Sequence, residues 1–225
     1  MSKTEVLANK EVIDSTNHSL AFHLGENAIQ TVLKFKYLGG ILTHDNSLDA
    51  EISNSIRSAA DAFGKLCKIG FWSDPLTIRL KARIYMTNVH SRLLYGSETW
   101  AVTQAHIHRL EVFQMSCLRR MLRLSLLDKR TNASIREQCH VPAIAQTVQQ
   151  RRLSWLGHLG RMEDFRLPKQ MLWGRVAHGG RQRGRPKQTW KCCVLQDLAE
   201  INLSRWYQSC QDRSRWRQNI KAGGN

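Results

Sequence analysis

Basic side chains are the groups in this sequence whose type and distribution most clearly point to chemistry. Residues 1–110 hold 12 Lys and Arg against 10 Asp and Glu, a net charge of +2, whereas residues 111–225 hold 22 against 8, a net charge of +14. Clustered Lys and Arg bind polyanions because their contact with phosphates releases counterions. The second half of the chain therefore predicts an RNA or DNA partner, with a merely soluble basic surface as the alternative.

Candidate nucleic-acid-binding residues occur in two groups within this half. Three arginines flank the apolar positions of an amphipathic helical segment, where arginine can hold phosphate oxygens through paired hydrogen bonds. Five more basic residues follow in and just after a glycine-rich stretch. The first group is Arg151, Arg152 and Arg161, and the second is Arg181, Arg183, Arg185, Lys187 and Lys191.

The four residues R-G-R-P at 183–186 match the core of an AT-hook, a peptide that lies in the minor groove of A/T-rich DNA. The glycines around them allow the extended backbone that a hook needs. However, a helical apolar pattern starts at Trp190, and Pro186 suits the position just before or within the first turn of a helix. We interpret the stretch as a connector whose basic side chains face phosphates, and the free-standing hook is the alternative.

No pattern in the sequence supports catalysis. Asp14, Ser15 and His18, or His44 and Asp45, could be fragments of a hydrolytic site. The chain contains nine histidines, so such proximities arise by chance, and no G-x-S-x-G motif supplies a nucleophile. We therefore expect no catalytic residue and no cofactor.

Cysteine spacing and hydropathy argue against two further kinds of site. The six cysteines form no C-x-x-C pair, which argues against a structural zinc and against a secreted disulfide framework. No apolar run approaches the ~20 residues of a membrane span. We therefore expect free thiols, no metal, no membrane contact and a location in the nucleus or cytoplasm. The cysteines are Cys67, Cys117, Cys139, Cys192, Cys193 and Cys210.

The spacing of apolar residues predicts a mainly α fold with three regions. Residues 1–45 are typical of a small antiparallel β element, with a hairpin signal at 25–27 and further strands split at 39–40. Residues 46–124 predict a bundle of three amphipathic helices. The residues expected to cap these helices are Asn46, then Ser73 or Asp74, then Thr103.

Residues 125–225 predict a basic helical unit. Trp155 and Trp190 could stack on bases in a nucleic-acid complex. Tryptophan at helical spacing among leucines more often packs in a core, and this is the role we favour. His158 lies on the same helix as Trp155 and is expected to be a hydrogen-bonded structural histidine. Helices are expected at about 132–139, 143–161, 187–203 and 204–221.

Seven short motifs follow one another along the chain. In order, they are "KTEVL", "FKYLGGIL", "LLYGSETW", "QMSCLRRML", "RRLSWLGHLGRM", "RLPK" and "GRPKQTW". Together they resemble the C-terminal end of the reverse transcriptase polyprotein of LINE-type (non-LTR) retrotransposons, particularly the RTE and Jockey-like lineages. The resemblance extends from about Lys3 to Arg217, and seven motifs in order at family-like spacing make it specific.

In that family a K-T-E segment ends the palm subdomain and F-K-Y-L-G forms the primer grip. The resemblance therefore implies that residues 1–45 contain a palm remnant and a primer-grip-like hairpin. It also implies that residues 46–124 form the thumb and that residues 125–225 form a nucleic-acid-binding tail. The residues implied for the primer grip are Phe35, Lys36, Tyr37, Leu38 and Gly39.

The polymerase centre of that family is missing from this sequence. It consists of an F/Y-x-D-D turn and a distant aspartate that hold two Mg²⁺ ions, whereas no two aspartates are adjacent here. The endonuclease of the family is also absent. We predict a nucleic-acid-binding fragment that is not an enzyme. An open frame encoding the palm upstream of Met1 would instead make the chain one end of an active polymerase.

Two alternatives to this function stay open, namely a translated transposon relic without function and a protein-interaction module derived from one. The N-terminal β element adds an expectation about partners. Without a palm to cover them, the apolar side chains between Val32 and Ile41 would be exposed. We therefore expect self-association through this element.

Overall fold

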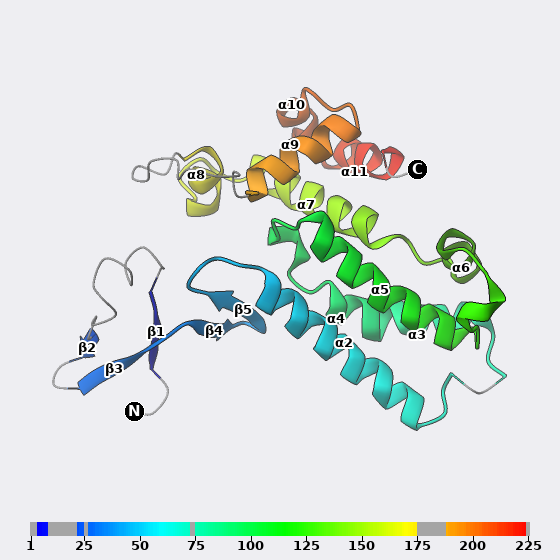
Figure 1. Ribbon diagram of the computed structural model, residues 1–225. Helices are drawn as coiled ribbons and strands as arrows, with labels where there is room; N and C mark the ends of the chain where they lie inside the picture. Colours follow the sequence, from blue (N-terminus) through cyan, green and yellow to red (C-terminus); the bar gives the residue numbers. More distant parts are fainter. Residues whose placement is uncertain (1–3, 9–21, 25–26, 73–74, 175–187, 224–225) are drawn as a thin grey trace.

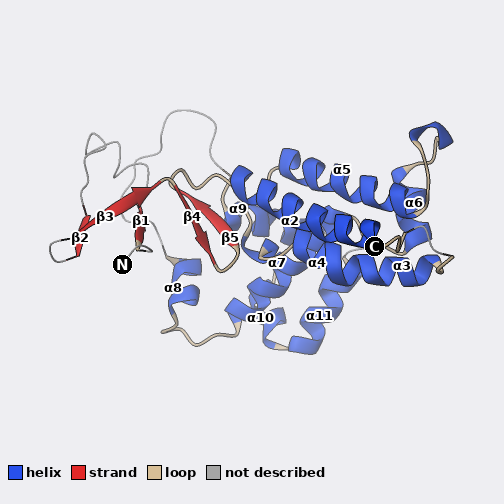
Figure 2. Ribbon diagram, turned by 90° about the horizontal axis from the view of Figure 1, so that it is seen from below, coloured by secondary structure: helices blue, strands red, loops and turns tan. Residues whose placement is uncertain are grey.

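Figure 1 shows the computed structural model of the chain, in which helices make up most of the fold and short strands lie near the N-terminus. The structure describes residues 4–8, 22–24, 27–72, 75–174 and 188–223. The strands gather at one end of the molecule and helices fill the rest (Figure 2). The mainly α fold predicted from the sequence is confirmed.

The first three strands described form a small sheet. β3 (Asn27–Val32) is central, with β2 (Phe22–Leu24) antiparallel on one side and β1 (Glu5–Leu7) parallel on the other. The pairing of β2 with β3 confirms the hairpin predicted around residues 25–27. The parallel pairing of β1 with β3 departs from the antiparallel arrangement that we expected, because β1 pairs with the third strand rather than with the second.

A separate hairpin lies between this sheet and the helices. β4 (Lys34–Tyr37) pairs antiparallel with β5 (Gly40–Thr43). Leu38 and Gly39 form the two-residue turn, and both have positive φ angles, 48° and 93°. Such a turn matches the twist of the strands, but it favours Asn-Gly because leucine is strained at positive φ. The side chain of Leu38 is 75% exposed.

The three amphipathic helices predicted after this hairpin are present, and they form a bundle. The first is α2 (Asp49–Lys68). The second continues from α3 (Ile78–Tyr85) through a π-helical turn at Met86–His90 into α4 (Ser91–Leu93). The third is α5 (Gln104–Met121).

Hydroxyl caps determine where two of these helices begin. Thr103 caps α5 as predicted, because its hydroxyl accepts a hydrogen bond from the amide of His106 at 3.3 Å. The His106 ring accepts one from the amide of Thr103 at 3.3 Å, which completes a capping box. Thr77 caps α3 in the same way. Ser73 and Asp74, the caps predicted for this helix, lie outside the described residues.

The start of α2 differs from the prediction. Asn46 has a φ angle of 56°, which places it in the preceding turn, so the prediction that it caps the helix is wrong. The hydroxyl of Ser47 instead accepts a hydrogen bond from the amide of Asp49 at 3.2 Å. The helix begins at Asp49, two residues later than a cap at Asn46 would give.

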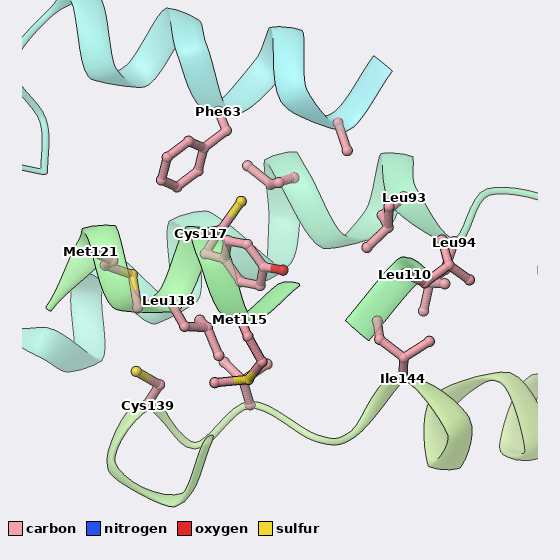
Figure 3. Packing of buried hydrophobic residues seen from close by; sticks show 14 of the residues in the cluster. Phe63, Leu93, Leu94, Leu110, Met115, Cys117, Leu118, Met121, Cys139 and Ile144 are labelled. Atoms are coloured by element: carbon pink, nitrogen blue, oxygen red, sulfur yellow. The ribbon is translucent and has the colours of Figure 1, made fainter. Parts of the chain in front are cut away.

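The larger hydrophobic core lies inside the bundle, where Phe63 of α2, Leu93 of α4 and Leu118 of α5 contribute side chains (Figure 3). Two later helices contribute to the same core. α6 (Asn132–Cys139) and the first half of α7 (Ile144–Gly160) pack against α5. The larger core therefore extends across the boundary that we predicted between residues 124 and 125. The members from beyond that boundary are Ile135, Cys139, Val141, Ile144 and Val148.

The C-terminal helices pack on the second half of α7, which lies between them and α5 (Figure 1). They enclose a smaller core, where Trp216 occupies the space that a side chain on Gly157 would fill. The helices are α8 (Leu167–Trp173), α9 (Trp190–Glu200), α10 (Trp206–Gln211) and α11 (Arg213–Ala222). The buried members of the smaller core are Leu153, Leu156, Val194, Leu198, Cys210, Trp216 and Ile220.

Two features of this region differ from the helices expected from the sequence. The segment predicted as one helix at 204–221 is divided into α10 and α11 at Asp212. The Asp212 carboxylate accepts hydrogen bonds from the amides of Ser214 at 2.8 Å and Arg215 at 3.1 Å, so it caps α11. α8, which begins with a proline in its first turn, was not expected at all.

Candidate nucleic-acid interface

Arg152 is buried between α7 and α9. Its guanidinium makes a two-point ion pair with Asp197, with Nε 2.6 Å from Oδ2 and Nη2 3.0 Å from Oδ1. A third hydrogen bond runs from Nη1 to the carbonyl oxygen of Trp100 at 3.2 Å. Burial raises the pKa of Asp197, and the arginine opposes that shift. Arg152 therefore joins the bundle to the C-terminal helices, and we leave it out of the candidate interface.

Arg151 and Arg161 are half-buried, and each contacts the backbone of another element. Arg151 donates from Nη1 to the carbonyl oxygen of Leu94 and, at 3.4 Å, to the hydroxyl of Ser97. Burial lowers the pKa of Arg151. Arg161 donates from Nη1 to the carbonyl oxygen of Cys210 at 2.7 Å. The three arginines predicted on α7 thus help to hold this helix in place, which is a role that spacing alone did not indicate.

Within the second predicted group, Lys191 lies in the described part of the chain. Its side chain is exposed on the first turn of α9. The other four basic residues and the R-G-R-P stretch lie outside the described residues, so the choice between connector and hook stays a prediction. These four are Arg181, Arg183, Arg185 and Lys187.

The two tryptophans singled out in the sequence have different surroundings. Trp190 packs against the smaller core, as expected, and its Nε1 donates to the carbonyl oxygen of Glu98 at 2.8 Å. Trp155 is half-buried, and its ring lies 5.2 Å from the ring of His158, measured between centroids. His158 is exposed, so it contacts an aromatic ring at the surface instead of the core.

A basic stripe that we did not predict runs along α11. Its three residues, Arg213, Arg217 and Lys221, are four residues apart, so they share one face of the helix, and all three are exposed. Trp216 and Ile220 direct another face of α11 into the smaller core. Within the described residues, no ion pair joins these three cations to a carboxylate. The spacing of the basic stripe is visible in the sequence and could have been found there.

The residues that the family resemblance assigns to a primer grip form β4 and the turn of the hairpin. Two side chains of α2 hold this hairpin by its backbone. Glu51 accepts a hydrogen bond from the amide of Ile41 at 2.5 Å, and Asn54 donates one to the carbonyl oxygen of Gly39 at 3.3 Å. Because the backbone makes these contacts, most side chains of the hairpin stay available. Those exposed are Lys36, Tyr37 and Leu38, while Phe35 is half-buried.

A groove of about 740 Å³ lies between this hairpin, α2 and α4. Lys36, Arg57 and Arg92 line it, one from each of the three elements, and all three are exposed. Most of the remaining lining is neutral and polar, including Asn54 and Asn88, and the carboxylates of Glu51 and Asp61 also line it. Cations and amide donors of this kind suit contact with phosphate oxygens.

Other chemistry finds little support in the described residues. They contain no group of three or more His, Cys, Asp and Glu that could hold a metal ion. No helix among them is long and apolar enough to cross a membrane. All six cysteines are free thiols. Burial raises the pKa of Cys117 to about 12 and that of Cys139 to about 11, so both stay protonated near neutral pH.

Comparison with known proteins relates most of the chain to a transposon-derived protein. The chain is similar to an uncharacterized transposon-derived protein of Caenorhabditis elegans, with 25% identity over 224 residues. The match covers 95% of this chain and 79% of the nematode protein. No protein-family model and no solved structure matches the chain. The similarity supports a transposon-related origin for the chain.

Proposed function

We propose that the chain binds nucleic acid through phosphate contacts, as the C-terminal fragment of a non-LTR retrotransposon reverse transcriptase. Two observations support the assignment to this kind of element. The seven ordered motifs resemble that polyprotein, and the similar nematode protein is described as transposon-derived. Since the paired aspartates of the polymerase centre are missing from the sequence, the proposed role is binding without catalysis.

The basic stripe on α11 is the observation that carries the proposal of nucleic-acid binding. Like charges four residues apart destabilise a helix by about 0.2–0.5 kcal/mol per pair. The stripe contains two such pairs, Arg213 with Arg217 and Arg217 with Lys221. A row of phosphates along this face would replace the repulsion with attraction and release counterions. An exposed row of cations without carboxylate partners is therefore suited to a polyanion.

The hairpin and its groove give independent support in the first half of the chain. Lys36, Arg57 and Arg92 line a groove bounded by the primer-grip-like hairpin, and they outnumber its two carboxylates, Glu51 and Asp61. This groove lies in the region where the resemblance implies the thumb. Phosphate contacts in the groove would fit a nucleic-acid strand that passes between the hairpin and α4.

The salt dependence of binding tests the proposal. Fluorescence anisotropy of a labelled duplex should give an association constant that falls with salt for the full chain. Arg213→Ala with Arg217→Ala removes two contacts of the basic stripe, so the slope of log K against log salt should become shallower by roughly 2. The double substitution is preferable to truncation at residue 124, which would remove Ile135 and Ile144 from the larger core.

A matched control exists on α3. Arg79 and Arg83 are also exposed arginines four residues apart on a helix, but they belong to the half of the chain with little net charge. Arg79→Ala with Arg83→Ala should leave the slope unchanged. Binding that does not depend on salt, or an equal change in both double variants, would contradict the proposal.

A further inference from the structure

Three aromatic side chains form a cluster between α8 and α10. Trp173 and Trp206 are nearly parallel, with ring centroids 5.9 Å apart and an interplanar angle of 17°. Tyr207 meets both rings edge-on, at 6.1 Å from Trp173 and 5.6 Å from Trp206. Trp206 also packs against the smaller core, so it fixes the other two rings to the body of the protein.

Lys169 fixes the position of α8 relative to this aromatic cluster. Its side chain is buried, and its ammonium group donates to the carbonyl oxygens of Met162 at 2.6 Å and Gly160 at 3.3 Å. The same group forms an ion pair with Asp164 at 2.8 Å and lies 5.7 Å from the centroid of the Tyr207 ring. A buried lysine with four partners holds the start of α8 against the end of α7 and the loop after it, and next to Tyr207 of α10. The positions of the three rings are therefore fixed in the absence of a ligand.

The outer rings of the aromatic cluster remain open to solvent. Trp173 is 52% exposed and Tyr207 is 42% exposed. An aromatic ring with an open face can stack on a nucleic-acid base, and such stacking tolerates any base because every base has a π-face. Trp173 is already parallel to Trp206, so a base on its outer face would extend the stack.

The charges around the aromatic cluster favour nucleic acid over a protein as the ligand. Among residues 161–174 and 188–223, the exposed charged side chains are seven cations and four carboxylates. Two of the carboxylates are already engaged, because Asp164 pairs with Lys169 and Asp212 caps α11. An apolar protein surface would cover the rings but leave the cations unpaired. The cations are Arg166, Lys191, Arg205, Arg213, Arg215, Arg217 and Lys221, and the carboxylates are Glu163, Asp164, Glu200 and Asp212.

We propose that this aromatic cluster binds unpaired bases of a single-stranded nucleic acid, with Trp173 as the stacking surface. Arg205 immediately precedes the two aromatic residues of α10, so it can contact the phosphate of a nucleotide stacked there. The basic stripe on α11 then continues the phosphate path, since α10 contacts both α8 and α11. This inference rests on the proposed function and adds a preference for strands with unstacked bases.

Substitution of Trp173 in the full chain tests this inference. Anisotropy would be measured with a labelled oligothymidine and with a labelled duplex of the same length. Trp173→Ala should weaken oligothymidine binding by roughly five- to a hundredfold, as expected for loss of one stacked base. Duplex binding should be unchanged, because paired bases do not present their faces. Trp173→Phe should restore most of the oligothymidine affinity.

The matched control is Met171→Ala on the same helix, which removes an exposed apolar side chain without a ring. It should leave both affinities unchanged, and circular dichroism should show all three variants folded.

If the parent chain binds neither probe, the proposed function itself fails, and this inference fails with it. If the parent binds both probes and Trp173→Ala binds them equally well, only the stacking site is overturned, and a protein ligand becomes the better explanation for the aromatic cluster. An equal loss of affinity for both probes in Trp173→Ala would also overturn the stacking site.

Discussion

The bundle and the C-terminal helices are stabilised by different kinds of contact. Within the described residues, the larger core has 22 buried members and the smaller core has seven. Hydrophobic stabilisation grows with the apolar area removed from water, so the C-terminal helices gain much less from burial. The structure compensates with directed polar contacts at the places where these helices meet the rest of the chain.

Buried polar groups show this difference most clearly. In the C-terminal helices, Arg152 pairs with Asp197, and the indole nitrogen of Trp216 donates to the carbonyl oxygen of Leu153 at 3.0 Å. In the bundle, the hydroxyl of Tyr85 and Nε2 of His90 are buried without a hydrogen-bond partner. A large apolar core can tolerate the free-energy cost of a buried polar group that has no hydrogen-bond partner. A small core is more dependent on hydrogen bonds and ion pairs between its buried polar groups.

The largest effect should follow from breaking the ion pair of Arg152. Arg152→Ala leaves Asp197 buried without its partner, and loss of one member of a buried pair costs about 3–5 kcal/mol. We expect amides of α9 and α11 to lose protection from hydrogen exchange, while amides of α2 and α5 keep theirs. Hydrogen exchange followed by mass spectrometry measures both regions in one experiment.

A second variant separates the charge from the packing. Arg152→Met combined with Asp197→Leu replaces the ion pair with apolar side chains of similar size, and such replacements are often neutral. Protection of α9 and α11 should therefore return. Equal loss of protection in α5 and α9 after Arg152→Ala would show that the two regions do not differ in the way we describe.

A smaller effect should follow from protonation of His90 in the bundle. Burial, with a contribution from the charge of Arg151, lowers the pKa of His90 from 6.5 to about 4. Between these values the unfolded chain binds a proton that the folded chain does not. The stability contributed by neutral His90 is thus fully present above pH 6.5 and is lost as the pH falls towards about 4, up to roughly 3 kcal/mol.

Urea unfolding at a series of pH values measures this loss. His90→Leu removes the titrating group, so its free energy of unfolding should depend less on pH across that window than that of the parent chain. His158→Gln is the control, because it removes an exposed imidazole and leaves the larger core intact. Parallel pH profiles for the parent and His90→Leu would refute the assignment.

The smallest effect concerns the hairpin, which is more exposed than either core. Leu38→Asn places a residue that tolerates positive φ in the turn and creates the favoured Asn-Gly pair, so the hairpin should gain roughly 0.5–1 kcal/mol. It also removes a leucine that is 75% exposed, which should weaken the self-association expected for this element. Sedimentation velocity and hydrogen exchange of β4 and β5 measure the two effects separately.

The control for the turn is Leu42→Asn on β5. Leu42 is 50% exposed, and it lies in a strand with no positive φ to relieve. This variant should weaken self-association without stabilising the hairpin. A gain in stability in both variants would mean that turn strain is not the cause, and unchanged self-association in both would argue against the hairpin as the contact.

Local signals predicted much of the fold and little of the candidate interface. Thr103 and the apolar spacing after it are sufficient to place α5, because a helix cap and its repeat depend on neighbours in the sequence. Burial of Arg152 depends on Asp197, which lies 45 residues further along and approaches it only after α9 packs on α7. A basic residue beside leucines looks the same in sequence whether it meets phosphate or a buried carboxylate.

The aromatic cluster illustrates the same limit. Trp173 lies in a segment for which no helix was expected, and its neighbours Trp206 and Tyr207 come from a helix more than thirty residues later. Helical spacing indicates that a tryptophan shares a face with apolar residues, but the exposed fraction depends on which helix covers that face. Only the basic stripe on α11, with its spacing of four residues, was available to sequence reasoning and overlooked.

Because α7 belongs to both cores, the two regions can open only in a fixed order. Its first half places Ile144 and Val148 in the larger core, and its second half places Leu153 and Leu156 in the smaller one. The C-terminal helices can detach while α7 stays packed in the larger core. The bundle cannot open without displacing α7, the helix against which the C-terminal helices pack. A ligand held by α8 to α11 would therefore stabilise the entire chain against unfolding, including helices that contribute no atom to its binding.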